Sequence, residues 1–256
     1  MPRTPEAESP MTPSALIGAS FLLFGLAWLA RPASPVGREI RGPILALWWL
    51  NRFYTTFWHR LEIENEPPLP TTGPAILISN HTCGIDHLLL QAATKRLLGF
   101  MIAQEYFDHK IYHPFCKAIG CIPVKRDGRD QTSIRLALRA LKDGRVVAIF
   151  PEGRINPTSG REFHDAKPGA AFIPLRAGVI VVPAYIRGTP PTNEILEALT
   201  TPSHARVVFG EPIDLSDLAE AEDRTAERAN IVAATERIMG AIRDLRDRAL
   251  ADPSRA

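Results

Sequence analysis

The sequence is poor in the features that define several common classes of protein. Its 256 residues include three cysteines, Cys83, Cys116 and Cys121, an odd number without paired spacing. This argues against a disulfide framework or a structural zinc site and favours a reducing compartment. Thirty Lys and Arg against 28 Asp and Glu leave a formal net charge of +2. The chain therefore lacks the strong positive charge that is typical of proteins that bind nucleic acids. A repeat period and low-complexity tracts are also missing, which excludes solenoid and collagen-like arrays.

The composition that remains is that of an ordinary folded domain. Hydrophobic residues make up 45% of the chain and charged residues 23%, which excludes a wholly disordered protein. The length suits one sizeable α/β domain and is too short for two once the ends are set aside.

The amino-terminal part differs from the rest of the chain. Residues 1–14 are polar and rich in proline, and we expect them to be disordered. Residues 15–30 form an uncharged run that as a helix would measure about 24 Å, less than the roughly 30 Å of a hydrocarbon core. The segment before this run is acidic, which disfavours a secretory signal peptide. The run could therefore span a bilayer only marginally or lie in its surface.

A second apolar stretch follows at residues 43–61. Polar pairs recur in it every four residues, which predicts an amphipathic helix with one apolar face. That face comprises Leu47, Leu50, Tyr54, Phe57, Trp58 and Leu61. All four tryptophans, Trp28, Trp48, Trp49 and Trp58, lie in the first 60 residues, and Trp favours the headgroup level of a bilayer.

Residues 15–62 are therefore predicted to be two membrane-anchoring helices. The positive-inside bias of Arg31, Arg38 and Arg41 would place the rest of the chain at the cytoplasmic face of the cell membrane. The alternative is that both segments are ordinary helices closing the core.

From residue 73 onward, short β-branched runs alternate with helical stretches. Strands are expected at residues 75–79, 100–103, 121–125, 145–150, 179–186 and 205–209. Helices are expected at residues 86–98, 105–119, 129–143, 168–177 and 223–250. This alternation predicts an α/β domain over residues 73–215, a mostly parallel sheet flanked by helices, with a carboxyl-terminal helix in residues 216–256 packed on it.

The segment NHTCGID follows the first strand and carries His81 and Asp86. An Asp at the start of the next helix could orient an imidazole, so that its other nitrogen takes a proton from a hydroxyl. Asp86 could instead be only a helix N-cap and His81 a loop residue. Two further readings make Cys83 a nucleophile or treat His81, Asp86 and His87 as metal ligands. His109 and His113, four apart on an expected helix, are a weaker metal candidate.

Two other clusters are candidates for binding. FPEGRINP places Glu152, Gly153 and Arg154 after a buried strand, where glycine permits close approach of a ligand and Glu152 could bind hydroxyl groups.

GCIPVKRDGR supplies Lys125, Arg126 and Arg129 at the end of another strand, and Lys167 lies just before a helix start. Such cations could hold a phosphate, although a solvated basic turn is the alternative.

Taken in order, NHTCGID, GCIPVKR, FPEGR and VVPAYI resemble the four sequence blocks of the glycerolipid acyltransferase superfamily, which includes the 1-acylglycerol-3-phosphate acyltransferases. The resemblance covers roughly residues 73–210. It implies that His81 is the general base and Asp86 its orienter, and that Arg126, Glu152 and Gly153 bind the acyl acceptor, with Arg126 on its phosphate.

The resemblance further implies acyl transfer from acyl-CoA or acyl carrier protein at the membrane surface, onto a membrane lipid acceptor, without a metal, a further cofactor or a covalent acyl-enzyme. Two departures leave the acceptor open. Arg154 directly follows FPEG, where many members have Thr before Arg, and Lys167 lacks the preceding aromatic residue. The acceptor could instead be another lysolipid, glycerol 3-phosphate or an aminolipid. Two other functions also remain as alternatives: a thioesterase or lipid hydrolase, and a non-catalytic lipid-binding module.

Overall fold

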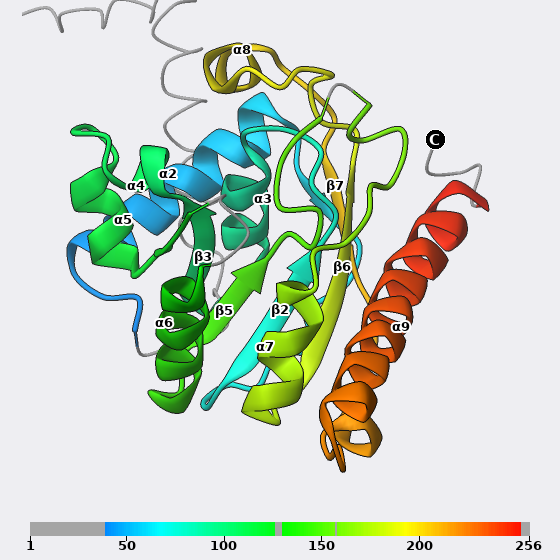
Figure 1. Ribbon diagram of the computed structural model, residues 1–256. Helices are drawn as coiled ribbons and strands as arrows, with labels where there is room; N and C mark the ends of the chain where they lie inside the picture. The colour runs from blue at the N-terminus through cyan, green and yellow to red at the C-terminus, as the bar shows by residue number, and fades with distance from the viewer. Residues whose placement is uncertain (1–38, 126–129, 157, 252–256) are drawn as a thin grey trace, which may run out of the picture. The chain divides into compact units, whose positions relative to one another are not determined.

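The computed structural model describes residues 39–125, 130–156 and 158–251, which contain a seven-stranded sheet in the order β1-β7-β6-β2-β5-β3-β4 (Figure 1). The strands are β1 (Glu62–Ile63), β2 (Ala75–Ser79), β3 (Leu98–Ala103), β4 (Ile122–Val124), β5 (Val146–Ile149), β6 (Val181–Arg187) and β7 (Arg206–Phe209). The helices are α2 (Pro43–Trp58), α3 (Asp86–Ala93), α4 (Gln104–Phe107), α5 (His113–Ile119), α6 (Gln131–Lys142), α7 (Gly169–Ala177), α8 (Ile195–Thr200), the short 3₁₀ turn η1 (Ser216–Leu218) and α9 (Arg224–Ala251).

The sheet is mostly parallel, as the alternation of strands and helices predicted. Strand β2 lies at its centre, parallel to β5 on one side and to β6 on the other. All five residues of β2 are buried, which is typical of a parallel strand covered on both faces. Within the described residues the antiparallel pair is β6 with β7.

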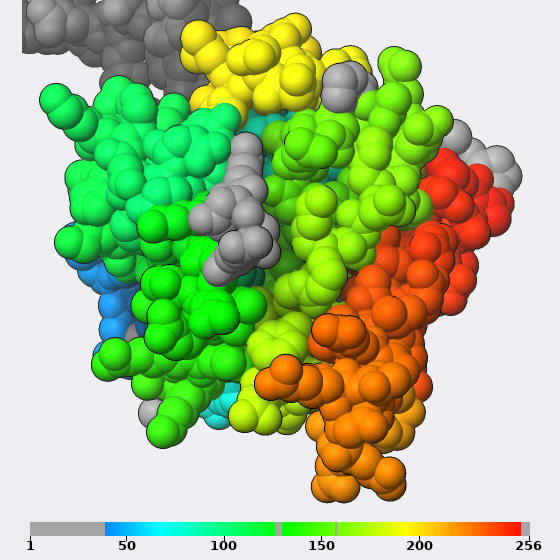
Figure 2. All heavy atoms as spheres, viewed as in Figure 1, coloured from blue at the N-terminus to red at the C-terminus, as the bar shows by residue number. Residues whose placement is uncertain are grey.

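Helices cover both faces of the sheet. One core forms where α6, α7 and α9 pack on it, and the other where α3 and α8 do. Figure 2 shows the first of these sides, with α6 in green at the left and α9 in orange to red at the right. Ile238, Ile242 and Leu245 of α9 are buried, so this helix packs into the core through an apolar stripe.

Several predicted boundaries are wrong, for local physical reasons. The helix expected over residues 86–98 ends at Ala93, because Thr94 is extended and Leu98 already pairs with β5. The helix expected over residues 105–119 is two short helices, α4 and α5. Pro114 stands in the first turn of α5, a place that proline tolerates although it breaks a helix interior. Strand β1 and helix α8 were not predicted.

Helix α2 is amphipathic, but its polar side faces the protein. Asn51 and Arg52 donate hydrogen bonds to the carbonyl oxygens of Leu88 (2.9 Å) and Ala92 (2.6 Å), both in α3, and Thr55 is fully buried. The exposed large apolar side chains of α2 are Leu47, Leu50, Phe53, Phe57 and Trp58. The helix thus uses polar contacts to dock and leaves an apolar surface outside.

One detail of the anchor prediction changes. Trp48 is 5% exposed, and its indole N–H contacts the carbonyl oxygens of Gln91 and Thr94, so this tryptophan packs inside the protein. Residues 1–14 and the run at residues 15–30 lie outside the described residues. Among the described helices, none has both the length and the apolar character needed to cross a membrane.

Candidate active site

The two polar motifs NHTCGID and FPEGR leave neighbouring strands at the same edge of the sheet. Strands β2 and β5 are parallel, with Ile78 opposite Ile149, and the motifs begin just beyond these two residues. The carboxyl ends of parallel strands are where open α/β sheets place their ligands. His81 and Glu152 meet there: the His81 backbone N–H donates to Glu152 Oε1 at 3.0 Å.

His81 and Asp86 are in direct contact. His81 Nδ1 lies 2.7 Å from Asp86 Oδ2, and because a carboxylate only accepts hydrogen bonds, Nδ1 is the donor. The same oxygen accepts the backbone N–H groups of Thr82 and Cys83. The other oxygen, Oδ1, accepts the Thr82 hydroxyl at 2.5 Å. Asp86 is fully buried, while the His81 side chain is 16% exposed, so the imidazole Nε2 is the end of the pair that a substrate can reach.

The plane of the His81 ring is also fixed. The ring stacks on Phe150, with 4.1 Å between centroids and an interplanar angle of 12°, and Phe150 stacks in turn on Phe100. Phe150 is the first residue of FPEG. The contact to Asp86 and the stack on Phe150 together leave the imidazole little freedom to rotate.

Glu152 is an internal residue. Its side chain accepts the backbone N–H of His81 and, at 3.4 Å, that of His164, and the residue is 2% exposed. Burial raises the pKa of this carboxyl above its usual value. This geometry favours a role in holding the His81 backbone over the contact with the acyl acceptor that the resemblance implied.

Asn80, the first residue of NHTCGID, ties the motif to β6. Its amide exchanges two hydrogen bonds with the backbone of Ile186, at 2.9 and 2.8 Å. The side chain thereby continues the β2–β6 pairing past the last residue of β2 and fixes the start of the loop that carries His81.

The geometry weakens the reading of Cys83 as a nucleophile. Cys83 is fully buried, its Sγ lies 3.7 Å from Asp86 Oδ1, and burial raises its thiol pKa to about 12. A reactive cysteine needs a lowered pKa and access, and Cys83 has neither.

Among the described residues, the geometry also disfavours the two hypotheses of metal binding. Burial lowers the pKa of His87 to about 4, and its ring packs against Phe100. His109 lies in the turn before α5 and not on a helix with His113, whose Nδ1 bonds to the Phe107 carbonyl. Residues 39–125, 130–156 and 158–251 contain no group of three or more His, Cys, Asp or Glu arranged to hold a metal ion.

The predicted cationic residues that the structure describes, Lys125, Arg154 and Lys167, lie at the same edge of the sheet. Lys125 is exposed just after β4, and its backbone N–H donates to Asp130 at 2.7 Å. Gly153 has a positive φ of 72°, and a Cβ there would lie 3.2 Å from Cγ of Lys167, so the stem of Lys167 runs along the FPEG turn. Arg154 is exposed. Arg126 and Arg129 fall outside the described residues.

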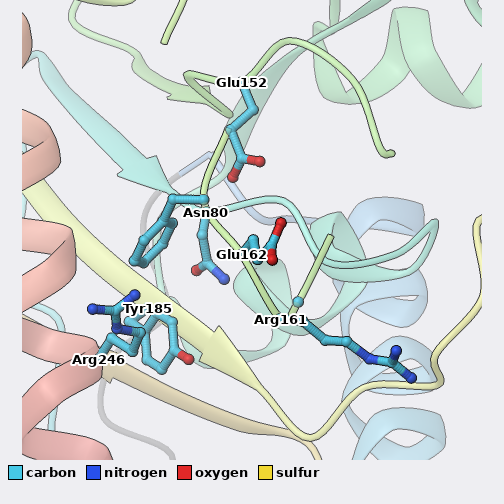
Figure 3. A pocket seen from close by; sticks show the side chains of 8 residues that line it. Asn80, Glu152, Arg161, Glu162, Tyr185 and Arg246 are labelled. Carbon is cyan, nitrogen blue, oxygen red and sulfur yellow. The ribbon is translucent and has the colours of Figure 1, made fainter. Parts of the chain in front are cut away.

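A small pocket lies beside Glu152. In Figure 3 the carboxylate of Glu152 points toward it, and Asn80, just after β2, and Tyr185, within β6, line it. Its lining is completed by Gly160, Arg161, Glu162, Phe163 and Arg246. The segment after FPEGR and helix α9 therefore both border this pocket, which the sequence motifs did not indicate.

Sequence reasoning missed the residues that support the His81–Asp86 pair. Thr82, Phe150 and Thr189 all lie in or beside the motifs, and the hydroxyl of Thr189 donates to that of Thr82 at 2.9 Å. The position of Thr82 within a loop capped by an aspartate was a signal for a side-chain hydrogen bond. Nothing in the sequence pattern places Thr189 next to it.

Comparison with known proteins agrees with the motifs. The family model "Acyltransferase" matches residues 60–187. The 1-acyl-sn-glycerol-3-phosphate acyltransferase of Bacillus subtilis (strain 168) is 26% identical over 179 residues, which span 70% of this chain and 86% of the relative. The enzyme of the same name from Streptococcus pneumoniae (strain ATCC BAA-255 / R6) is 27% identical over 190 residues, 73% of this chain and 66% of the relative.

The fold also matches a solved structure. The crystal structure of the 1-acyl-sn-glycerophosphate (LPA) acyltransferase PlsC from Thermotoga maritima superposes with a TM-score of 0.62 at 19% identity, over 90% of this chain and 89% of the other. The model match covers half of the chain, from just before β1 to the end of β6. The chain belongs to the acyltransferase family, as its four motifs predicted, and is an O-acyltransferase.

Proposed function

We propose that the chain moves a fatty acyl group from an acyl thioester, acyl-CoA or acyl-ACP, to the free hydroxyl of 1-acylglycerol 3-phosphate, which gives phosphatidic acid for phospholipid synthesis. The observation that carries the proposal is the 2.7 Å contact between His81 Nδ1 and Asp86 Oδ2 at the carboxyl edge of the sheet. It is supported by two relatives that bear the name 1-acyl-sn-glycerol-3-phosphate acyltransferase.

In the proposed reaction His81 is the general base. Its Nε2 takes the hydroxyl proton while the acceptor oxygen attacks the thioester carbonyl carbon, and Asp86 stabilises the imidazolium that forms. The carbon–sulfur bond then breaks, and the thiolate leaves and receives the proton, so the products are an ester and a free thiol. A thioester has a good leaving group, so the site's main tasks are to remove one proton, align the hydroxyl and stabilise the oxyanion.

The phosphate of the acceptor would be bound by cations at this edge. Arg126 is assigned to it by the family resemblance, and Lys125, Arg154 and Lys167 would assist. Lys167 is supported by its position, because its stem follows the Gly153 turn close to Glu152. Planar guanidinium groups suit a phosphate because they can donate two parallel hydrogen bonds.

The chain would act at the cytoplasmic face of the cell membrane, with the outer face of α2 on the lipid surface. This face is apolar because the polar side chains of α2 are used in hydrogen bonds to α3. Amphipathic helices that expose Trp, Phe and Leu bind bilayer interfaces in proportion to the apolar area they bury. A lipid surface also contains the water-insoluble acceptor.

Co-sedimentation of the full-length chain with phospholipid vesicles tests this placement. Leu50 in α2 and Val232 in α9 are each 64% exposed, which makes them a matched pair. Leu50→Glu is expected to lower the vesicle-bound fraction, and Val232→Glu to leave it unchanged. Equal binding by both variants would contradict the role of α2.

Thiol release from palmitoyl-CoA or acyl-ACP, with and without 1-acylglycerol 3-phosphate, tests the reaction. We expect release that depends on the acceptor and that falls by about 10²–10⁴-fold in His81→Ala, the usual contribution of a general base. Release without acceptor would instead indicate a thioesterase. Near-native turnover by His81→Ala would remove the base assignment.

The phosphate assignment has its own test. Arg126→Ala and Lys167→Ala are expected to raise KM for 1-acylglycerol 3-phosphate and to leave kcat nearly unchanged, since the phosphate does not take part in the reaction. Lys142→Ala is the control, because Lys142 is exposed at the end of α6 that precedes β5, at the opposite edge of the sheet. An unchanged KM in either site variant would remove that residue from the phosphate site.

A further inference from the structure

The loop between β6 and α8 reaches back to the loop that carries His81. Strand β6 ends at Arg187, and Gly188 follows with a φ of 72°. A side chain there would be strained and its Cβ would collide with the carbonyl oxygen of His204. The glycine therefore permits the sharp turn that directs Thr189 toward NHTCGID.

Thr189 begins a continuous chain of hydrogen bonds that ends at the imidazole. Its hydroxyl donates to Thr82 Oγ1 at 2.9 Å, and the Thr82 hydroxyl donates to Asp86 Oδ1 at 2.5 Å. Asp86 Oδ2 accepts His81 Nδ1 at 2.7 Å. We propose that Thr189 is a positioning residue for the general base, acting through Thr82 and Asp86. The inference rests on the proposed function of His81.

The direction of each donation explains why a second hydroxyl is needed. A threonine hydroxyl has one proton and two lone pairs, whereas a carboxylate only accepts. When Thr189 donates into a lone pair of Thr82, the single proton of Thr82 is directed to Asp86. Hydrogen bonds in such chains also polarise and strengthen one another.

Asp86 Oδ1 has little else to hold it. Within residues 39–125, 130–156 and 158–251, its other contact is the thiol of Cys83 at 3.7 Å, and a thiol is a weak donor. Oδ2, in contrast, is held by the ring of His81 and the backbone N–H groups of Thr82 and Cys83. The orientation of the carboxylate about its own axis therefore depends on the Thr82 hydroxyl, and that hydroxyl depends on Thr189.

The same loop also packs against the catalytic loop at a second point. Gly84 lies between His81 and Asp86, and a Cβ at this glycine would lie 2.9 Å from Cγ1 of Ile195, the first residue of α8. The close approach fixes the distance between the two loops, which holds the Thr189 hydroxyl within reach of Thr82.

The test compares Thr189→Val, which removes the hydroxyl and keeps the shape, with Thr189→Ser, which keeps the hydroxyl. Thr192→Val is the matched control, because this threonine of the same loop donates to Glu197 at 2.5 Å and lies outside the chain of hydrogen bonds. A neutral hydrogen bond of ordinary strength corresponds to about a 3- to 10-fold effect. We expect Thr189→Val to lower kcat by this factor with an unchanged acceptor KM, Thr189→Ser to restore it, and Thr192→Val to match the native protein.

A second readout separates this inference from the proposed function. Carbethoxylation of His81 by diethyl pyrocarbonate, followed by peptide mass spectrometry, reports on imidazole reactivity without any acyl substrate. Thr189→Val is expected to change the carbethoxylation rate by about 3- to 10-fold. In an Asp86→Asn background the same substitution is expected to change neither kcat nor the carbethoxylation rate further. If the native protein shows no acceptor-dependent turnover but Thr189→Val still changes the carbethoxylation rate, the proposed function is overturned and the inference about Thr189 stands. Native-like kcat and carbethoxylation in Thr189→Val, or a failure of Thr189→Ser to restore them, would overturn the inference.

Discussion

Replacing Asp86 by Asn tests the central pair of the site most directly. The two side chains have nearly the same shape, but Asn has no charge and only one acceptor oxygen. If the amide NH₂ turns toward His81, Nδ1 has to accept and Nε2 carries the proton, which leaves no base. If the amide oxygen faces His81, the ring keeps its tautomer but its positive charge is no longer balanced in the transition state.

The size of the effect follows from the geometry of the pair. The contact is 2.7 Å and Asp86 is fully buried, so charge centres about 4 Å apart at an effective dielectric constant of 20 interact by about 4 kcal/mol. Only part of the charge has developed in the transition state, and the Asn dipole retains some attraction. We therefore expect about 2–4 kcal/mol to be lost, which is about a 30- to 1,000-fold decrease in kcat.

The assay is acceptor-dependent thiol release, measured as kcat and KM on protein whose fold is checked by circular dichroism. Asp223→Asn is the control: Asp223 accepts the Thr225 and Ala226 N–H groups at the start of α9, at 2.8 Å each, and is exposed. That variant removes a charge but keeps an N-cap residue, because Asn caps a helix about as well as Asp, and it should keep its kcat. A folded Asp86→Asn variant with more than one third of the native kcat would refute the reasoning.

Three further predictions concern neighbours of the pair. Cys83→Ala should stay within about fivefold of native kcat, because a buried thiol with a pKa of about 12 is a poor nucleophile; a loss beyond about 10³-fold would restore the nucleophile reading. Glu152→Ala should lower kcat and leave the acceptor KM unchanged, since it removes the oxygen that accepts the His81 backbone N–H; a raised KM alone would return Glu152 to acceptor binding. His87 has a pKa lowered by burial to about 4, below its unfolded value of about 6.5, so the unfolded chain binds more protons between these pH values. The free energy of unfolding should therefore fall by up to about 3 kcal/mol as the pH drops from 6.5 to 4, and urea titrations of His87→Gln should show a smaller fall; equal falls would be inconsistent with a neutral His87.

The sequence predicted the fold class because its signals were local. AILIS and RVVAIF are short apolar runs bounded by polar turns, and they are strands β2 and β5. The long helix α9 shows its apolar spacing directly. Predicted boundaries were wrong where a neighbouring strand determined the structure. Leu98 ends the stretch that predicted a helix, yet it pairs with β5.

Helix α2 shows the limit of a periodicity argument. The pattern correctly indicated two faces, but a pattern does not say which face meets the protein. The polar face docks here because α3 offers backbone carbonyl groups, such as that of Leu88, to Asn51 and Arg52. Such acceptors are invisible in the sequence of α2 itself.

The sequence by itself indicated the His81–Asp86 pair of the candidate site. His81 and Asp86 stand on either side of one turn, and this spacing is enough to bring an imidazole and a carboxylate together because the two residues are only five positions apart in the chain. The four motifs likewise determined the family.

Only the tertiary structure decided what surrounds that pair. Phe150 reaches His81 because β5 lies beside β2, and Thr189 reaches Thr82 because β6 lies on the other side of β2. These contacts join residues 69 and 107 positions apart in the chain. Strand order, and not local spacing, brings such residues together, because parallel strands end at one edge of the sheet whatever their distance along the chain.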